Sequence, residues 1–184
     1  MAVALSKPMS VEEFLAWERR QELRYEFDGI QPVAMTGGTI AHSVIATNIV
    51  RALEDRLKFP CRVFRGDLKI IAAGRVRYPD AVVTCTPVPD DADIVPEPRI
   101  VFEVLSSSTA IVDRNVKAGE YWETPSIQRY VLLEQTRADA TVLYRSGDSW
   151  SEVRLSGLDA VLALPEVEAN VALAEVYRRI QFPS

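Results

Sequence analysis

Two segments, Tyr78 to Cys85 (YPDAVVTC) and Arg99 to Leu105 (RIVFEVL), decide the fold that we predict for this chain. Both are apolar nearly throughout, and strands of this composition are typically buried on both faces of a sheet. Each nevertheless carries one acid, Asp80 in the first and Glu103 in the second. Two carboxylates on neighbouring buried strands repel each other unless a divalent cation lies between them, and carboxylate oxygens suit Mg²⁺ or Mn²⁺. With Lys117 nearby in the sequence, the pattern predicts metal-dependent phosphodiester hydrolysis at one sheet edge.

The N-terminal third is expected to form two helices separated by a hairpin. Ser10 and Glu13 make a capping box, which predicts a helix of about 12 residues. Asp28-Gly29 interrupts the strand-like segment from Tyr25 to Met35, a pattern typical of a β-hairpin. From His42 to Phe59, apolar residues recur every four positions, which predicts an amphipathic helix that Pro60 ends.

The rest of the chain reads as strands around one further helix. The segment 86–98 is rich in proline and acids, so we expect a surface loop. A helix should begin near Asp113 and end at Trp122, before Pro125. The remaining expected elements are strands at 62–72, 129–134, 140–144 and 150–155, a turn at 146–148, and a short helix near 172–179.

This order of elements favours an α/β (α+β) fold, in which helices flank a mixed central β-sheet. We expect a single domain over residues 1–184, because the chain is long enough for one sizeable core and shows no convincing boundary. An apolar content of 48% argues for a folded globule. No apolar run approaches the roughly 20 residues of a membrane span, and no signal peptide is visible, so we expect a cytoplasmic protein.

The net charge of −5 argues against a protein that coats nucleic acid non-specifically. A local basic cluster is still present between Arg62 and Arg77, and it is either a basic patch or one solvated face of a hairpin. The two cysteines, Cys61 and Cys85, are too few for a disulfide framework or a thiolate metal site. We expect them to be reduced thiols in the core.

Several short motifs, in this order and spacing, resemble the Uma2 family (formerly DUF820) of the PD-(D/E)XK nuclease superfamily. They extend over most of the chain: Arg24-Tyr25-Glu26 with Asp28-Gly29, Met35 to His42 (MTGGTIAH), Tyr78-Pro79-Asp80, Glu103 to Ser106 with Ser108-Thr109, Asp113 with Lys117 and Tyr121, and Pro125 to Ile127 leading into Tyr130 to Leu132. The resemblance implies a restriction-endonuclease-like core and an endonuclease, a hydrolase that cleaves DNA with Mg²⁺ or Mn²⁺. It also implies a homodimer, because related nucleases often pair to address two strands.

Transferred by this resemblance, the metal ligands are Asp80, Glu103 and the backbone carbonyl of Val104. The superfamily commonly places a lysine two residues after the second acid, but this chain has Leu105 there. Lys117 is therefore expected to supply the catalytic ammonium from the following helix. Glu26 matches another acid of the pattern and is a further catalytic candidate.

Each candidate also has a plain structural explanation. Asp80 can cap a turn, Lys117 can pair with Asp113 four positions earlier on a helix, and Glu26 can be a solvated acid at a strand end. Glu103 is harder to explain in this way, because an unpaired carboxylate in a buried strand costs several kcal/mol. For His42, the only histidine, we favour a supporting role, and for Gly37-Gly38 a turn.

Two other groups of side chains are given structural roles. The segment Ser106 to Thr109 is expected to cap a helix, although it can also bind phosphate. Tyr121, Trp122 and Tyr130 are expected in the core or at an interface.

Three functions remain open at this point. The first is a Mg²⁺-dependent endodeoxyribonuclease; the second is a nucleic-acid-binding protein that keeps the fold but cleaves weakly or not at all; the third is a structural protein. Metal binding separates the first from the third, and cleavage separates the first from the second.

Overall fold

A six-stranded mixed sheet forms the centre of the computed structural model, which describes residues 9–35, 37–106 and 109–182. Its strands lie in the order β10-β9-β8-β7-β6-β3; only β7 and β8 run parallel, and the other neighbours are antiparallel. The expected mixed central sheet is therefore confirmed. The bounds are β3 (Arg62–Arg65), β6 (Ala81–Thr84), β7 (Ile100–Val104), β8 (Arg129–Leu133), β9 (Asp139–Ser146) and β10 (Ser149–Ser156).

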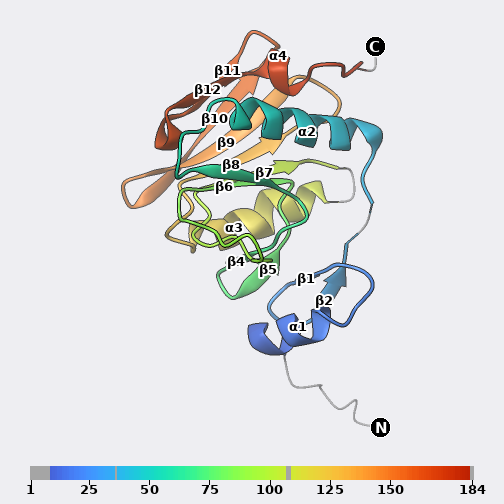
Figure 1. The fold of residues 1–184 in the computed structure, drawn as a ribbon. Helices are drawn as coiled ribbons and strands as arrows, with labels where there is room; N and C mark the ends of the chain where they lie inside the picture. Colours follow the sequence, from blue (N-terminus) through green and yellow to red (C-terminus); the bar gives the residue numbers. More distant parts are fainter. Residues whose placement is uncertain (1–8, 36, 107–108, 183–184) are drawn as a thin grey trace.

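The central strands are buried on both faces, as their composition predicted. In β7, Ile100, Phe102 and Val104 pack on one face, while Val101 packs on the other, because side chains alternate along a strand. The first face is covered by α2 (Ile40–Glu54), α4 (Leu173–Val176) and a small β11–β12 sheet. The opposite face carries α3 (Ala118–Trp122), so that helices flank the sheet (Figure 1).

A second, four-stranded sheet has the order β2-β1-β5-β4. Phe14 of the first helix stacks on Phe27 of this sheet with ring centroids 5.1 Å apart, which fixes the helix there. In Figure 1 this N-terminal helix and the β1–β2 hairpin lie at the end of the molecule away from the C-terminus. The elements are α1 (Val11–Glu18), β1 (Tyr25–Phe27), β2 (Pro32–Ala34), β4 (Ile70–Ala72) and β5 (Arg75–Arg77).

The expected helices are present, but their first or last residues differ from those predicted. Ser10 and Glu13 form the predicted capping box, but α1 is only eight residues long. Helix α2 ends at Glu54 rather than Phe59; just beyond it, the Arg56 guanidinium donates to the Ala52 carbonyl and pairs with Glu175. The segment predicted as one α-helix from Asp113 is π-helical over η1 (Val112–Lys117) and becomes α-helical only in α3.

The strand predictions were incomplete in two places. The expected strand at 62–72 is two strands, β3 and β4, which belong to different sheets. The hairpin of β11 (Val161–Leu164) and β12 (Ala169–Ala172), joined through η2 (Pro165–Val167), was not predicted. Buried and exposed residues alternate along β11, but its sequence (VLAL) is apolar throughout and does not show this alternation.

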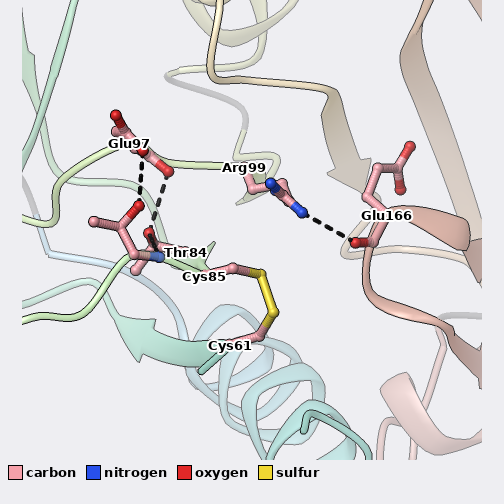
Figure 2. Close-up of a disulfide and its surroundings, with 7 residues drawn as sticks. Cys61, Thr84, Cys85, Glu97, Arg99 and Glu166 are labelled. Carbon is pink, nitrogen blue, oxygen red and sulfur yellow. Dashed lines mark hydrogen bonds between the residues drawn. A yellow bond between two sulfur atoms is a disulfide. The ribbon is translucent and has the colours of Figure 1, made fainter. Parts of the chain in front are cut away.

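The two cysteines form a disulfide, so the expectation of reduced core thiols was wrong. Cys61 precedes β3 and Cys85 follows β6; since Arg62 pairs with Thr84 in the antiparallel ladder, the next residues outward face each other. Figure 2 shows the bridge, with Thr84 donating to the Glu97 carbonyl beside it. Only the pairing of two distant strands brings these sulfurs together, which spacing along the chain did not reveal.

The basic cluster between Arg62 and Arg77 is neither one patch nor one hairpin face. Arg62 lies in the six-stranded sheet, whereas Arg77 lies in the four-stranded sheet. Lys69 is buried between Glu18 and Asp93, so its charge is compensated inside the protein. Among the helices of the described residues, none has the length and apolar content needed to cross a membrane.

Candidate active site

The two acids singled out in the sequence lie at the same edge of the central sheet. Ala81 of β6 pairs with Phe102 of β7, so Asp80 and Glu103 are the next residues outward on adjacent strands. Oδ2 of Asp80 accepts a hydrogen bond of 2.7 Å from the backbone N–H of Val104. This bond ties the carboxylate to β7 and holds it beside Glu103.

Lys117 reaches this edge from η1. Its Nζ lies 2.9 Å from Oε1 of Glu103, 3.2 Å from Oδ1 of Asp113 and 3.3 Å from Oε1 of Glu26. The Lys117 side chain is 8% exposed, so these contacts are made in a poorly solvated interior. The pairing with Asp113 expected on a helix surface is thus present, but it is one of three contacts to buried or nearly buried acids.

Glu26 connects the two sheets at the site. Its Oε1 accepts a hydrogen bond from the Tyr78 backbone N–H at 3.1 Å, and its Oε2 accepts one from Arg77 at 3.1 Å. Arg77 in turn makes two hydrogen bonds, of 2.7 and 2.6 Å, to the buried carboxylate of Glu120. Paired, two-pronged contacts of this kind fix a guanidinium in orientation. Glu26 is therefore held in place rather than solvated.

The carboxylate cluster shifts the protonation of its members. Burial raises the pKa of Glu103, and the charges of Asp80, Asp113 and Glu26 add to the increase, although Lys117 opposes it. Burial alone would lower the pKa of Lys117, but Glu103 and the other acids outweigh burial, so its pKa is raised and the ammonium form is favoured. The site therefore holds more negative charge than one lysine neutralises.

His42 contacts the other side of Asp80. Its Nε2 lies 3.1 Å from Oδ2 of Asp80, and this hydrogen bond raises the pKa of the imidazole. The histidine comes from the first turn of α2, which Thr39 caps by accepting a bond from the His42 N–H. A Cβ on Gly38 would lie 3.1 Å from Nδ1 of His42, so a residue without a side chain lets the loop pass close to the ring.

These groups surround one cavity of ≈ 350 Å³. The five residues predicted for the site all line it, and their catalytic and metal-binding roles remain predictions. The predicted residues are Glu26, Asp80, Glu103, Val104 and Lys117. The cavity is also lined by residues that the sequence argument had not placed in the site, notably Asp113.

The donor set fits a small divalent cation. Four carboxylates, those of Glu26, Asp80, Glu103 and Asp113, line a cavity with one lysine. Oδ1 of Asp113 is buried and has no hydrogen-bond partner of good geometry, although it keeps its 3.2 Å ion-pair contact with Lys117. Within the described part of the chain, no three histidine, cysteine or carboxylate side chains are arranged to hold an ion by themselves. Two carboxylates and a backbone carbonyl would leave the other positions to water, an arrangement that Mg²⁺ commonly adopts.

Structural roles were expected for the neighbouring aromatic and hydroxyl residues, and most of these expectations hold. Tyr121 and Tyr130 are fully buried, whereas Trp122 is half exposed. Tyr121 also contacts the site, since its hydroxyl lies 3.5 Å from Oε1 of Glu103. Ser106 accepts a hydrogen bond from the Thr109 N–H, as a cap does; Thr36, Ser107 and Ser108 of the motifs lie outside the described residues.

The comparisons with known proteins match most of the chain to one family. The model of the Uma2 family, described as "Putative restriction endonuclease", matches residues 11–174. "Uncharacterized protein slr1290" of Synechocystis sp. (strain ATCC 27184 / PCC 6803 / Kazusa) is 32% identical over 179 residues, which cover 95% of this chain and 94% of the relative. "Uncharacterized protein sll1609" of the same organism is 28% identical over 170 residues, covering 87% and 94%.

A solved structure shares the fold. The crystal structure of "a putative nuclease belonging to DUF820" from Anabaena variabilis ATCC 29413 matches with a TM-score of 0.68 at 18% identity. The match covers 92% of this chain and 98% of that one, so the two chains share a fold over most of their length.

Proposed function

Because the chain belongs to the Uma2 family, we propose that it is a metal-dependent endonuclease that hydrolyses phosphodiester bonds of DNA. One observation carries the proposal: Lys117 lies 2.9 Å from Glu103 in a cavity that also holds Asp80. These are the three residue types that the chemistry requires, and three separate segments of the chain supply them.

In the proposed site, Asp80, Glu103 and the Val104 carbonyl hold Mg²⁺ or Mn²⁺. The ion would polarise a phosphoryl oxygen and lower the pKa of bound water. Lys117 keeps its proton at neutral pH, so its ammonium can orient the attacking water or compensate charge that develops on the phosphate. Glu26 supports this role, because it contacts Lys117 and is itself fixed by Arg77.

A homodimer in the cytoplasm belongs to the same proposal. Related nucleases often pair, so that each subunit supplies one site for one strand of a duplex. Apolar side chains near the cavity are available for such a contact: Ile40 is 85% exposed and Ile111 is 77% exposed. Sedimentation of the purified protein would measure the oligomeric state directly.

The function is tested by cleavage of supercoiled plasmid and of labelled single-stranded DNA with Mg²⁺, Mn²⁺ or EDTA. We expect metal-dependent nicking by the wild type and a loss of about 100-fold or more in Asp80→Asn and in Glu103→Gln. Asp148→Asn, a change of an exposed turn carboxylate, is the matched control and should cut normally. Full activity of either site variant would overturn the mechanism. A wild type that binds DNA but never cuts would instead support a non-cleaving DNA-binding protein.

A further inference from the structure

A second cavity, of ≈ 560 Å³, adjoins the first. Gly38, His42 and Asp80 line both cavities, so the His42–Asp80 pair forms the wall between them. If one phosphodiester of a DNA strand is bound at Asp80, the neighbouring nucleotides must lie on either side of this residue. The second cavity is the space directly next to that point.

Two arginines, Arg24 and Arg65, line this second cavity. Neither guanidinium forms an ion pair with any carboxylate of the described residues. By contrast, the other cations of the surrounding strands are compensated: Lys69 by Glu18 and Arg77 by Glu120. In an acidic protein, two uncompensated arginines in a cavity are a site for a polyanion.

Both arginines are exposed, and the fold sets where each of them lies beside the cavity. Arg65 is the last residue of β3 and pairs with Ala81, the residue after Asp80. A Cβ on Gly66 would lie 3.3 Å from the carbonyl oxygen of Pro79, so glycine allows this turn to lie against the Asp80 segment. The Arg24 guanidinium lies 5.9 Å from the centre of the Tyr78 ring, a cation–π distance.

The two cavities differ in charge: acids dominate the first, whereas the second also carries two arginines that can attract the phosphates of a DNA strand. The first cavity holds four carboxylates against Lys117, so it repels every phosphate except one that is bound through an ion. The second cavity is lined by Arg24 and Arg65 together with Asp67 and the shared Asp80, and Asp80 is already paired with His42. The incoming strand is therefore favoured on the arginine side.

We propose that Arg24 and Arg65 bind the DNA phosphate adjacent to the bond that is cut, and that the second cavity is the subsite for the neighbouring nucleotide. This proposal rests on the proposed function, because it takes Asp80 as the position of the scissile phosphate. Contacts to phosphate carry no base information, so the subsite accepts any sequence. Asp67 opposes the arginines in this subsite and weakens binding.

The test measures binding of a short fluorescein-labelled DNA strand by anisotropy, in EDTA, over a series of salt concentrations. Arg24→Ala and Arg65→Ala should each weaken binding about five- to tenfold and reduce the slope of log K against log salt by about one. Asp67→Asn should strengthen binding by about twofold, since it removes a negative charge. Arg51→Ala, an exposed and unpaired arginine three turns along α2, is the matched control and should bind as the wild type does. Thermal melts establish that all variants are folded.

The outcomes separate this inference from the proposed function. If the wild type cuts DNA with Mg²⁺ while Arg24→Ala and Arg65→Ala bind like Arg51→Ala, the subsite is wrong and the nuclease stands. If the wild type never cuts but both variants lose affinity, the subsite stands and the nuclease assignment fails. A wild type that neither binds nor cuts overturns both. In the cutting assay, the subsite further requires a raised KM with little change in kcat in the two arginine variants.

Discussion

Nζ of Lys117 lies 2.9 Å from Oε1 of Glu103, although one residue belongs to a π-helical segment and the other to a β-strand. The superfamily pattern places a lysine on the strand itself, at the position that Leu105 occupies here. Lys117 reaches the same acid from η1, on the face of the sheet toward which both Glu103 and Leu105 point, because side chains alternate along β7. An ammonium therefore lies beside Glu103 although position 105 is a leucine.

Glu103→Gln should make the metal-free protein more stable. The pKa of Glu103 is raised in the folded state, so ionising this group at a pH above its ordinary value of 4.5 costs free energy of folding. In EDTA at pH 8 we expect the variant to have a higher free energy of unfolding than the wild type in denaturant unfolding. The gain should shrink as the pH is lowered toward 4.5, because the wild-type carboxyl then takes up its proton. Added Mg²⁺ should stabilise the wild type only; equal stabilisation of the variant would remove Glu103 from the ligand set.

Lys117→Met should be strongly destabilising, by about 3–5 kcal/mol, because it leaves Glu103, Asp113 and Glu26 without their shared cation. Urea unfolding at pH 7.5 measures the loss. The matched control is Lys58→Met, since Lys58 pairs with Glu168 but its side chain is 81% exposed. We expect the control to change stability by less than about 0.5 kcal/mol. Equal effects in the two variants would mean that Lys117 is an ordinary surface lysine.

His42→Gln should lose stability in a pH-dependent manner. The hydrogen bond to Asp80 raises the pKa of His42 above its ordinary value of 6.5. Its contribution is therefore fully present below pH 6.5 and is lost as the pH rises through the raised folded-state value. Glutamine fills a similar volume without the charge, so we expect a deficit of about 1 kcal/mol at pH 6 that shrinks by pH 9. A deficit that stays constant across this range would assign His42 to packing alone.

Replacing both cysteines, in Cys61→Ser with Cys85→Ser, should lower the unfolding free energy by up to about 3 kcal/mol. The reason is that the bridge closes a loop over a sequence separation of 24 and so restricts the unfolded chain. Reductant should bring the melting temperature of the wild type down toward that of the variant and leave the variant unchanged. Alkylation of two free thiols in the unreduced wild type would contradict the bridge.

The sequence was sufficient for the central strands, and it singled out residues that the structure brings together around one cavity. The buried strands β6, which follows Asp80, and β7, which carries Glu103, were predicted because both segments are apolar nearly throughout. The capping box at Ser10 and the hairpin at Asp28-Gly29 were predicted because both depend on neighbouring residues only. Local chemistry determines such features.

Features that depend on distant residues were not predicted. The sequence did not reveal that Glu54 is the last residue of α2 or that Cys61 bonds to Cys85. Each of these depends on which strand or helix packs alongside, and tertiary packing overrides local propensity.

By itself, the sequence determined which residue types are available for chemistry: two acids in buried strands, a lysine displaced to the next helix, and a single histidine. Only the tertiary structure decided their arrangement, because strand register sets Asp80 beside Glu103 and the position of η1 against the sheet brings Lys117 to them. The tertiary structure also decided which cationic side chains lack an ion-pair partner: Lys69 and Arg77 form buried ion pairs, whereas Arg24 and Arg65 form none with the described residues. Charge compensation depends on distances in space, which the order of residues along the chain does not specify.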